Sequence, residues 1–202
     1  VVDGSYFHNV WGVTNIQHGD LFGWYYSLVA VTDKFINFIR ALLQSLLQYD
    51  SHSISEDLLK GMYEGLIPVE LRRQLGEFYT PDWLAHSIVN RCMDEDPEAK
   101  FLDPACGSGT FPFLVVREKI LRLSNDMSPL ELRDHIIENV HGGDLNPVSI
   151  QISKMNYLIA MGNILYEIEC PNEHEFRLPL NDCDSLCEPT VITQLSGRVA
   201  QF

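Results

Sequence analysis

Two short apolar segments, each leading through a turn into a helix, constrain the fold of this chain more than any other feature. Residues 101–102 run into a glycine turn at 103–109, and an apolar helical run follows over 110–123. Residues 140–144 have the pattern of a second strand, and Asn-Pro at 146–147 is typical of a helix start. Strands that alternate with helices favour a parallel sheet, because parallel strands need a crossover connection. The sequence therefore predicts an α/β fold.

The first 75 residues are predicted to form an aromatic-rich, helical segment ahead of the main domain. Residues 1–30 are rich in aromatic side chains and glycine, which predicts an irregular segment packed by its rings. Residues 31–49 carry apolar side chains at helical spacing. Ser53 and Glu56 form a capping box that predicts a second, short helix.

Residues 76–202 are predicted to form the main domain, a partial parallel sheet with flanking helices. Thr80 is the expected N-cap of a helix that has Pro81 at its first position, and Ser128 with Pro129 opens a later helix. A third strand is predicted over residues 176–180. The apolar positions expected on the helices after Pro81 and Pro147 are Leu84, Ile88 and Val89 in the first and Ile152, Met155 and Ile159 in the second.

The charge of the chain bears on its partners. The formal net charge is -14, and the acidic residues are scattered along the sequence. Affinity for DNA comes largely from Lys and Arg that neutralise phosphates, so such a surface would repel a duplex. No apolar stretch is long enough to cross a bilayer, and five cysteines without tight pairing are typical of a reducing compartment. We expect a cytoplasmic protein with no membrane span, whose contacts with any DNA lie largely outside these residues.

Four residues near the C-terminus raise the question of a metal site. Cys170 and His174, then Cys183 and Cys187, form two pairs with the same four-residue offset, a set that zinc would accept. Most structural zinc sites use tighter pairs than these. Free thiols are therefore favoured, and no metal site is predicted.

The candidate ligand site lies where the predicted strands end, the edge at which open parallel sheets bind ligands. Gly107 and Gly109 allow a sharp turn and a close approach of the backbone to a ligand, although glycine turns also serve packing. Asp144 would offer a carboxylate to a ribose with two free hydroxyls, or else it is a solvated turn residue that caps the next helix. The sequence separation of Gly109 and Asp144 exceeds the ~20 residues of the dinucleotide fingerprint, and the helix that begins at Pro129 accounts for the excess. A third glycine is also missing, since Phe111-Pro112 occupies its place, which favours a nucleoside without a pyrophosphate.

Three segments carry a resemblance to a known family. Asp-Pro-Ala-Cys-Gly-Ser-Gly-Thr-Phe at 103–111 resembles the cofactor loop of the gamma-type adenine-N6 DNA methyltransferases of restriction–modification systems. Leu-Gly-Glu-Phe-Tyr-Thr-Pro at 75–81 is similar to the segment that precedes this loop, and Gly-Asp-Leu-Asn-Pro at 143–147 is similar to their second cofactor motif. Residues 57–83 and 19–25 also resemble large single-chain restriction–methylation enzymes. The resemblance implies a Rossmann-like methyltransferase fold that binds S-adenosylmethionine.

The resemblance also implies how the methionine part of the cofactor would be held. Tyr79 and Thr80 would hold its carboxylate. The backbone at Ala105 and Gly107, with Asp103 behind it, would receive the amino group and the sulfonium arm. A carboxylate near a cationic ligand adds Coulomb attraction in a partly dry cleft.

The nucleoside part would contact the ends of the next two strands. Asp144 would accept from the ribose hydroxyls, with Gly109 completing the glycine turn. Asp184 would accept from the adenine amino group, with Asp182 as a neighbouring candidate two residues away. Cys106, inside the cofactor loop, is expected to serve core packing.

The resemblance implies one further segment that these residues lack. In the family, an Asn-Pro-Pro-aromatic segment holds the flipped adenine for methyl transfer, and the 202 residues contain no such tetrapeptide. We therefore expect no catalytic residue here, and an excised piece that does not methylate DNA by itself. The incomplete sheet would leave a free edge, which favours self-association.

Two alternatives stay open at this point. The chain could be a non-catalytic module that senses S-adenosylmethionine or supports assembly, with residues 31–65 docking a partner. It could also belong to a methyltransferase that acts on RNA or protein, since the pocket reports the methyl donor and not the acceptor.

Overall fold

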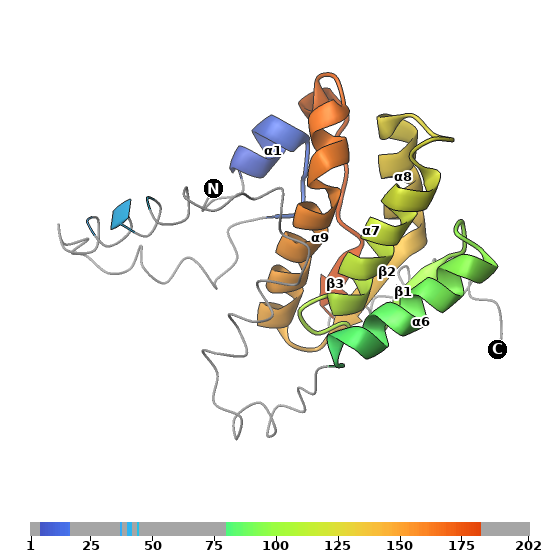
Figure 1. Cartoon of the computed structure of the whole chain (residues 1–202). Helices are drawn as coiled ribbons and strands as arrows, with labels where there is room; N and C mark the ends of the chain where they lie inside the picture. Colours follow the sequence, from blue (N-terminus) through green and yellow to red (C-terminus); the bar gives the residue numbers. More distant parts are fainter. Residues whose placement is uncertain (1–4, 17–36, 38–39, 42–43, 45–79, 183–202) are drawn as a thin grey trace, which may run out of the picture.

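The structure is a computed structural model of the chain, and it describes residues 5–16, 37, 40, 41, 44 and 80–182. Within these residues helices pack around a small sheet (Figure 1). Of the helix predicted over 31–49, the four described residues are helical, and the predicted capping box at 53–56 lies outside the described residues. The elements in chain order are α1 (Ser5–Trp11), α6 (Asp82–Glu95), β1 (Phe101–Asp103), α7 (Thr110–Leu123), α8 (Pro129–Asn139), β2 (Val140–Asp144), α9 (Pro147–Glu167), the 3-10 helix η3 (Pro171–Glu173) and β3 (Leu180–Asp182).

The described sheet has three parallel strands in the order β1-β2-β3. Phe101 pairs with Val140, and Gly142 pairs with Leu180. Each strand reaches the next through at least one helix, as parallel neighbours require. The predicted α/β class and the parallel sheet are therefore confirmed.

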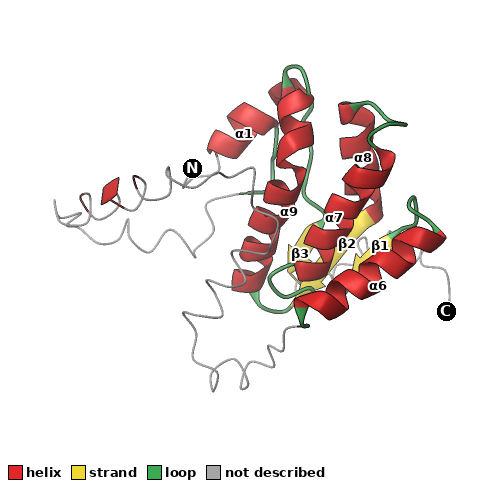
Figure 2. Cartoon of the chain, in the orientation of Figure 1, coloured by secondary structure: helices red, strands yellow, loops and turns green. Residues whose placement is uncertain are grey.

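Helix α7 is the centre of the packing. It contacts β1 and β2 of the sheet and lies against α6 and α9, and Figure 2 shows it in front of the strands with α9 on one side and α6 on the other. Most of its side chains are buried, which matches its nearly continuous apolar sequence. The largest apolar side chains that are almost fully buried come from α6, α7, α8, α9 and β3 and from segments next to them: Met93, Phe113, Leu132, Ile136, Tyr157, Met161, Leu165, Leu178 and Leu180.

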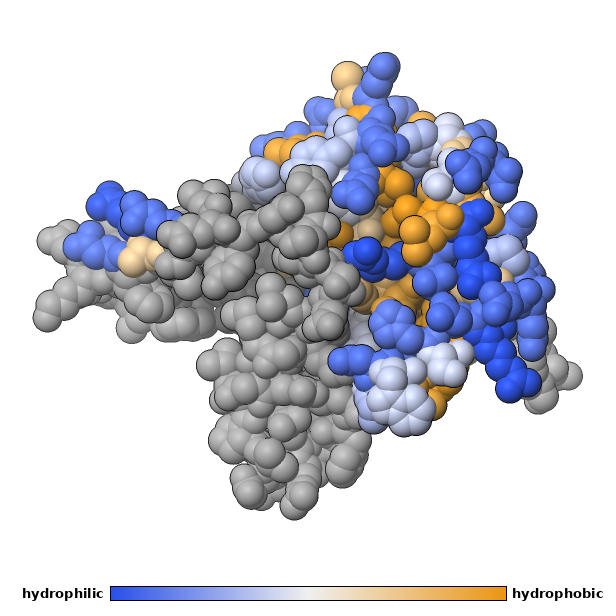
Figure 3. All heavy atoms as spheres, in the orientation of Figure 1, coloured by the Kyte–Doolittle hydropathy of each residue, from blue (hydrophilic) through white to orange (hydrophobic). Residues whose placement is uncertain are grey.

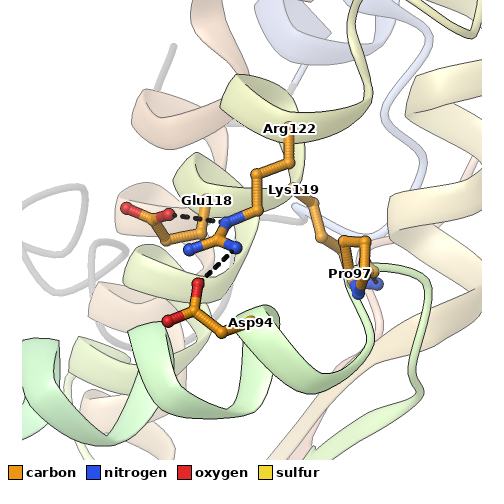
Figure 4. Close-up of polar contacts among 5 residues, drawn as sticks. All are labelled: Asp94, Pro97, Glu118, Lys119 and Arg122. Atoms are coloured by element: carbon orange, nitrogen blue, oxygen red, sulfur yellow. Dashed lines mark hydrogen bonds and ion pairs between the residues drawn. The ribbon is translucent and has the colours of Figure 1, made fainter.

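Polar contacts fix α6 and the loop after it against α7 (Figure 4). Arg122 of α7 pairs with Asp94 of α6 at 2.7 Å and with Glu118 of its own helix at 3.2 Å. One turn earlier, the fully buried Lys119 donates to the carbonyl oxygens of Pro97 (2.8 Å) and Ala99 (2.9 Å). Helix α7 therefore holds both the end of α6 and the loop that leads into β1. The face drawn in Figure 3 is otherwise mainly hydrophilic over the described residues, with apolar side chains gathered near its middle.

Residues 5–16, here called the N-terminal strap, pack onto this domain. Val13 (1% exposed) forms a parallel bridge with Phe176, and Ile16 (7% exposed) joins the same core. The Asn15 side chain donates to the Leu178 carbonyl and accepts from the Leu178 amide, both at 2.8 Å. The strap thus extends the core built by residues 80–182.

The first part of the strap corrects one prediction. Ser5–Trp11 is a helix and not an irregular segment. The predicted ring packing is present, because Tyr6, Phe7 and Trp11 contact one another and Trp11 lies edge-on to Tyr166 at 6.1 Å between ring centroids.

The third strand also differs from its prediction, since β3 is Leu180–Asp182 and not 176–180. Phe176 and Leu178 are buried and alternate as in a strand, but their backbones bond to the strap. Pro179 has no N–H to donate, and its carbonyl accepts from Gly142 at 3.0 Å. The chain therefore changes pairing partner at Pro179 and bonds to β2 from the Pro179 carbonyl onward.

Two helices bury faces that differ in part from those predicted. Helix α6 begins at Asp82, with Pro81 as its N-cap and no side-chain cap, so Thr80 is not the cap. The Pro81 carbonyl accepts from the amides of residues 84 and 85, which sets the helix one residue late. Ala85, Val89 and Met93 face the core, whereas Ile88 is 42% exposed. On α9, Ile159 is 39% exposed, and Ile152 and Met155 are half-buried.

The other local signals are confirmed. Ser128 and Glu131 form the complete capping box of α8, and the Asn146 side chain caps α9 by accepting from the Val148 amide at 3.0 Å. Over the ranges that the structure describes, no helix combines the length and the apolar character needed to cross a bilayer.

Candidate functional site

The carboxyl ends of β1 and β2 bring two acidic residues to one edge of the sheet. β1 ends at Asp103, which is in register with Gly142, and β2 ends two residues later at Asp144. Burial raises the pKa of the Asp103 carboxyl, a hydrogen bond from Ala105 partly offsets this, and the negative charge of Asp144 raises the pKa further. Neither carboxylate forms an ion pair within the described residues. This edge is therefore electron-rich and suits a cationic ligand.

The glycine turn between β1 and α7 is held by its own amides. Ala105 donates to Asp103 Oδ1 (3.1 Å), and Gly107 donates to Asp144 Oδ2 (2.8 Å). The Cys106 amide donates to the Gly143 carbonyl at 2.9 Å. These bonds tie the turn to the end of β2, so the three predicted site residues Asp103, Gly107 and Asp144 lie together.

Both glycines of the turn adopt backbone conformations that other residues rarely take. Gly107 has φ +54° and Gly109 has φ +91°, which confirms the sharp turn predicted there. The close approach predicted at Gly109 is to α9, not to the open edge of the sheet. A Cβ at this position would overlap with Ser153 Oγ and lie 3.0 Å from Ser153 Cα.

Asp144 connects the two turns at this edge. Its Oδ2 accepts from Gly107 and its Oδ1 accepts from the Asn146 amide, each at 2.8 Å. Asn146 supplies the side-chain cap of α9, so the alternative role of Asp144 as that cap is wrong. Each carboxylate oxygen has two acceptor positions, which leaves one on each oxygen for a further donor such as a hydroxyl.

The carbonyl groups of the turn offer further acceptors. The Ala105 and Gly107 carbonyls accept no N–H hydrogen bond from residues 5–16 or 80–182, and the Gly107 oxygen has only a weak contact with the Cys106 thiol at 3.9 Å. The second oxygen of Asp103 likewise has no donor in this part of the chain. Carbonyl and carboxylate oxygens at one turn can together receive an ammonium group or lie beside a sulfonium.

Two buried polar residues of α9 lie beneath the turn and were not predicted. Asn156 donates from Nδ2 to the Ser108 carbonyl at 2.9 Å, and Ser153 Oγ lies 3.8 Å from Cys106 Sγ. Both side chains are 1% exposed. The sequence contains a signal for them, since Ser149, Ser153 and Asn156 recur at four- and three-residue spacing on one side of an apolar helix.

The remaining predicted site residues are placed as follows. Tyr79 and Asp184 lie outside the described residues. Thr80 is half-buried and directly precedes Pro81 at the start of α6. Asp182, at the end of β3, is in register with Asp144, so a third strand also ends in an acidic residue at this edge.

The cysteines give no support to a metal centre. Burial raises the pKa of the Cys106 thiol to about 12, so it packs as a neutral group, as expected. Cys170 is exposed, and Cys183 and Cys187 lie outside the described residues. Within those residues no three His, Cys, Asp or Glu side chains gather in a way that could hold a metal ion.

Comparison with known proteins assigns the chain to a family. The N-6 DNA methylase family matches residues 54–182, which include the glycine turn, both acidic strand ends and α9. The chain belongs to the N-6 DNA methylase family. The resemblance predicted from residues 103–111 and 143–147 is therefore confirmed.

Two relatives are longer proteins, and this chain aligns with only part of each. The adenine-specific methyltransferase PglX of Streptomyces coelicolor is 28% identical over 99 residues, which cover 44% of this chain and 8% of that protein. The type I restriction enzyme MjaIX methylase subunit of Methanocaldococcus jannaschii is 37% identical over 84 residues, or 42% of this chain and 13% of the subunit. The N-6 DNA methylase chain thus aligns with a small part of each relative.

Proposed function

We propose that this N-6 DNA methylase chain is the S-adenosylmethionine-binding part of an adenine-N6 DNA methyltransferase of a restriction–modification system. The observation that carries the proposal is the turn at 103–109, held against Asp144 at the carboxyl edge of a parallel sheet. The family match and the names of the two relatives, an adenine-specific methyltransferase and a type I restriction methylase subunit, support the reaction and the system.

The chemistry of the edge fits this cofactor. S-adenosylmethionine carries its transferable methyl group on a positively charged sulfonium and also has an ammonium group. Asp103 and Asp144 stand close enough for one to raise the pKa of the other, and neither has a cationic partner within the described residues. A cation at this edge would relieve that repulsion. The ammonium group and the sulfonium arm are assigned to the carbonyls of Ala105 and Gly107 and to Asp103.

The remaining contacts extend around the same edge. Asp144 would receive the ribose hydroxyls on its two remaining acceptor positions. Tyr79 and Thr80 would hold the methionine carboxylate, and Asp184 would accept from the adenine amino group. The register of Asp182 with Asp144 supports an acidic group at the end of the third strand.

The acceptor and the partners of the chain follow from the same proposal. The 202 residues contain no Asn-Pro-Pro-aromatic tetrapeptide and carry a net charge of -14. We therefore assign the flipped adenine and the contacts with DNA to parts of the parent protein outside this chain, in the cytoplasm, and expect no methylation by the chain alone. β1 and β3 are the outer strands of the described sheet, and β1 exposes 41% of Leu102, which favours self-association.

Calorimetry with S-adenosylmethionine and S-adenosylhomocysteine tests the pocket. Asp144→Ala should weaken binding of both compounds by about 10- to 100-fold, as expected for hydrogen bonds to a charged group. Asp126→Ala, a change at an exposed aspartate in the turn after α7, is the matched control and should bind as the unaltered chain does. Equal affinities of the Asp144 and Asp126 variants would remove Asp144 from the site.

A second variant tests the charge at the site. Asp103→Asn keeps the shape of the side chain and removes its negative charge. Because only S-adenosylmethionine carries the sulfonium, this variant should lose affinity for it more than for S-adenosylhomocysteine. Failure of the unaltered chain to bind either compound would overturn the proposed function.

A further inference from the structure

We infer that Asn156, together with Ser153, is a positioning residue that holds the glycine turn in the shape that binds the cofactor. The inference rests on the proposed function, because it names residues that act on that site from beneath. Neither side chain reaches the open edge of the sheet, since both are 1% exposed. Their effect on a ligand is therefore exerted through the backbone of the turn.

Asn156 fixes the peptide at the middle of the turn. Its Nδ2 donates to the Ser108 carbonyl, between two glycines that both have positive φ. Ser108 has a glycine on each side, so the backbone around this carbonyl has more rotational freedom than one flanked by other residues. A buried side-chain donor aimed at the carbonyl removes that freedom, so the Gly107 amide stays directed at Asp144.

Ser153 determines how closely the turn approaches α9. The ideal Cβ of Gly109 would lie within 3.0 Å of three Ser153 atoms, including its Cα. The turn therefore rests directly on the backbone of the helix. Ser153 Oγ also lies 3.8 Å from Cys106 Sγ, so the same residue contacts the turn at two positions.

Helix α9 is itself fixed by hydrogen bonds to neighbouring elements. It begins three residues after Asp144, whose carboxylate bonds to the Asn146 amide just ahead of the helix. Tyr157, next to Asn156, is fully buried and donates its hydroxyl toward the carbonyls of Ile136 and Val140, each at 3.2 Å. One helix thus connects α8, the start of β2 and the glycine turn, and the turn keeps its place relative to Asp144.

The burial of Asn156 supports a specific role for its amide. Placing an amide in the core is unfavourable unless its hydrogen bonds are made, and an apolar residue would otherwise suit this face of α9. The bond to Ser108 satisfies one donor, and it does so at a turn in which two glycines have positive φ. The geometry therefore directs this polar group to the turn rather than to general packing.

The test compares two asparagines of the same helix. Asn156→Ala removes the donor to Ser108, whereas Asn163→Ala changes an exposed asparagine two turns later. By calorimetry, the dissociation constant for S-adenosylmethionine should rise on the order of tenfold for Asn156→Ala and stay unchanged for Asn163→Ala. Ser153→Ala, a milder change, should raise it by a smaller factor. Equal affinities of the two asparagine variants would overturn the inference.

Amide hydrogen exchange separates this inference from the proposed function, because it needs no ligand. Asn156→Ala should speed exchange at residues 106–109 more than in β2 or α8, whereas a purely structural loss would speed exchange throughout the domain. Unchanged exchange at the turn in both Asn156→Ala and Ser153→Ala would overturn the positioning role. If the unaltered chain binds no cofactor, the proposed function fails, and the exchange pattern still decides whether α9 holds the turn.

Discussion

At the scale of single residues, Gly109 shows why the turn tolerates so little change. Its φ of +91° disfavours any side chain, and α9 occupies the space in which a Cβ would lie. We expect Gly109→Ala to lower the free energy of unfolding by about 2 kcal/mol or more, since the left-handed backbone and the overlap with Ser153 both contribute. Urea denaturation measures this loss, and a variant as stable as the unaltered chain would contradict the close contact.

Lys119 is a second residue whose surroundings are unusual. It is fully buried, its amine donates to two carbonyls, and His135 Nε2 lies 3.4 Å away. Asn139 Nδ2 faces His135 Nδ1 at 3.3 Å. Burial lowers the pKa of Lys119 to about 8, against the opposing effect of Asp96 and Glu98.

This lowered pKa predicts a stability that depends on pH. Between about pH 8 and pH 10.5 the unfolded chain binds a proton at Lys119 that the folded chain has released. The free energy of unfolding should therefore rise with pH across this window, by on the order of 1 to 3 kcal/mol, and be independent of this group below it. Denaturation of the unaltered chain and of Lys119→Met at several pH values measures the difference. Parallel pH curves for the two proteins would contradict the lowered pKa.

At the scale of elements, local signals located the helix starts at Ser128 and Asn146 correctly, whereas the N-cap predicted at Thr80 lies one residue too early. The capping box at Ser128 and the Asn146 cap lie within a few residues of the helices that they start, and both are present. The strand predicted over 176–180 is wrong because its partner is the N-terminal strap, about 160 residues away in sequence. Period-two burial is the same whichever neighbour a strand has, so the sequence pattern could not identify the bonding partner.

In the candidate site, too, some residues could be predicted from local sequence and others could not. Asp103, Gly107 and Asp144 could be predicted from sequence because Asp103 and Asp144 end strands and Gly107 lies in the turn after β1. The parallel sheet brings such strand ends to one edge. The roles of Asn156 and Ser153 depend on how α9 lies under the turn, which no local pattern specifies. Their polar character on a buried helix face was the available signal. The assignments of Tyr79 and Asp184 stay predictions, since both lie outside the described residues.

Helix α9 itself can be strengthened at one position. Gly162 lies inside the helix, and a Cβ added there would meet no atom within 4 Å. Alanine favours the helical backbone over glycine by about 0.5 to 1 kcal/mol, so Gly162→Ala should raise the midpoint of thermal unfolding. Together with Gly109→Ala it forms a matched pair, the same substitution with opposite expected signs. A lowered midpoint for Gly162→Ala would show that this part of α9 is more crowded than the structure indicates.

At the scale of the whole molecule, the domain includes residues from well before the family match. The match begins at residue 54, yet Val13 and Ile16 belong to the same apolar core as Phe176 and Leu178. The strap also contacts α9, because Lys154 donates to the Asn15 carbonyl at 3.1 Å. Lys154 directly follows Ser153 in α9. The stability of the helix under the glycine turn is therefore linked to the start of the chain.

Asn15 is the residue through which this link is best tested. Its side chain makes both a donated and an accepted hydrogen bond with the backbone of Leu178, a residue that is 1% exposed. Asn15→Ala would leave a buried amide and a buried carbonyl without these partners, and we expect a loss of about 1 to 3 kcal/mol in the free energy of unfolding. Asn9→Ala, in the exposed part of the same strap, is the matched control and should change stability by less than about 0.5 kcal/mol. Urea denaturation of both variants measures these changes. If the strap only lay on the surface of the domain, the two variants would lose the same free energy of unfolding.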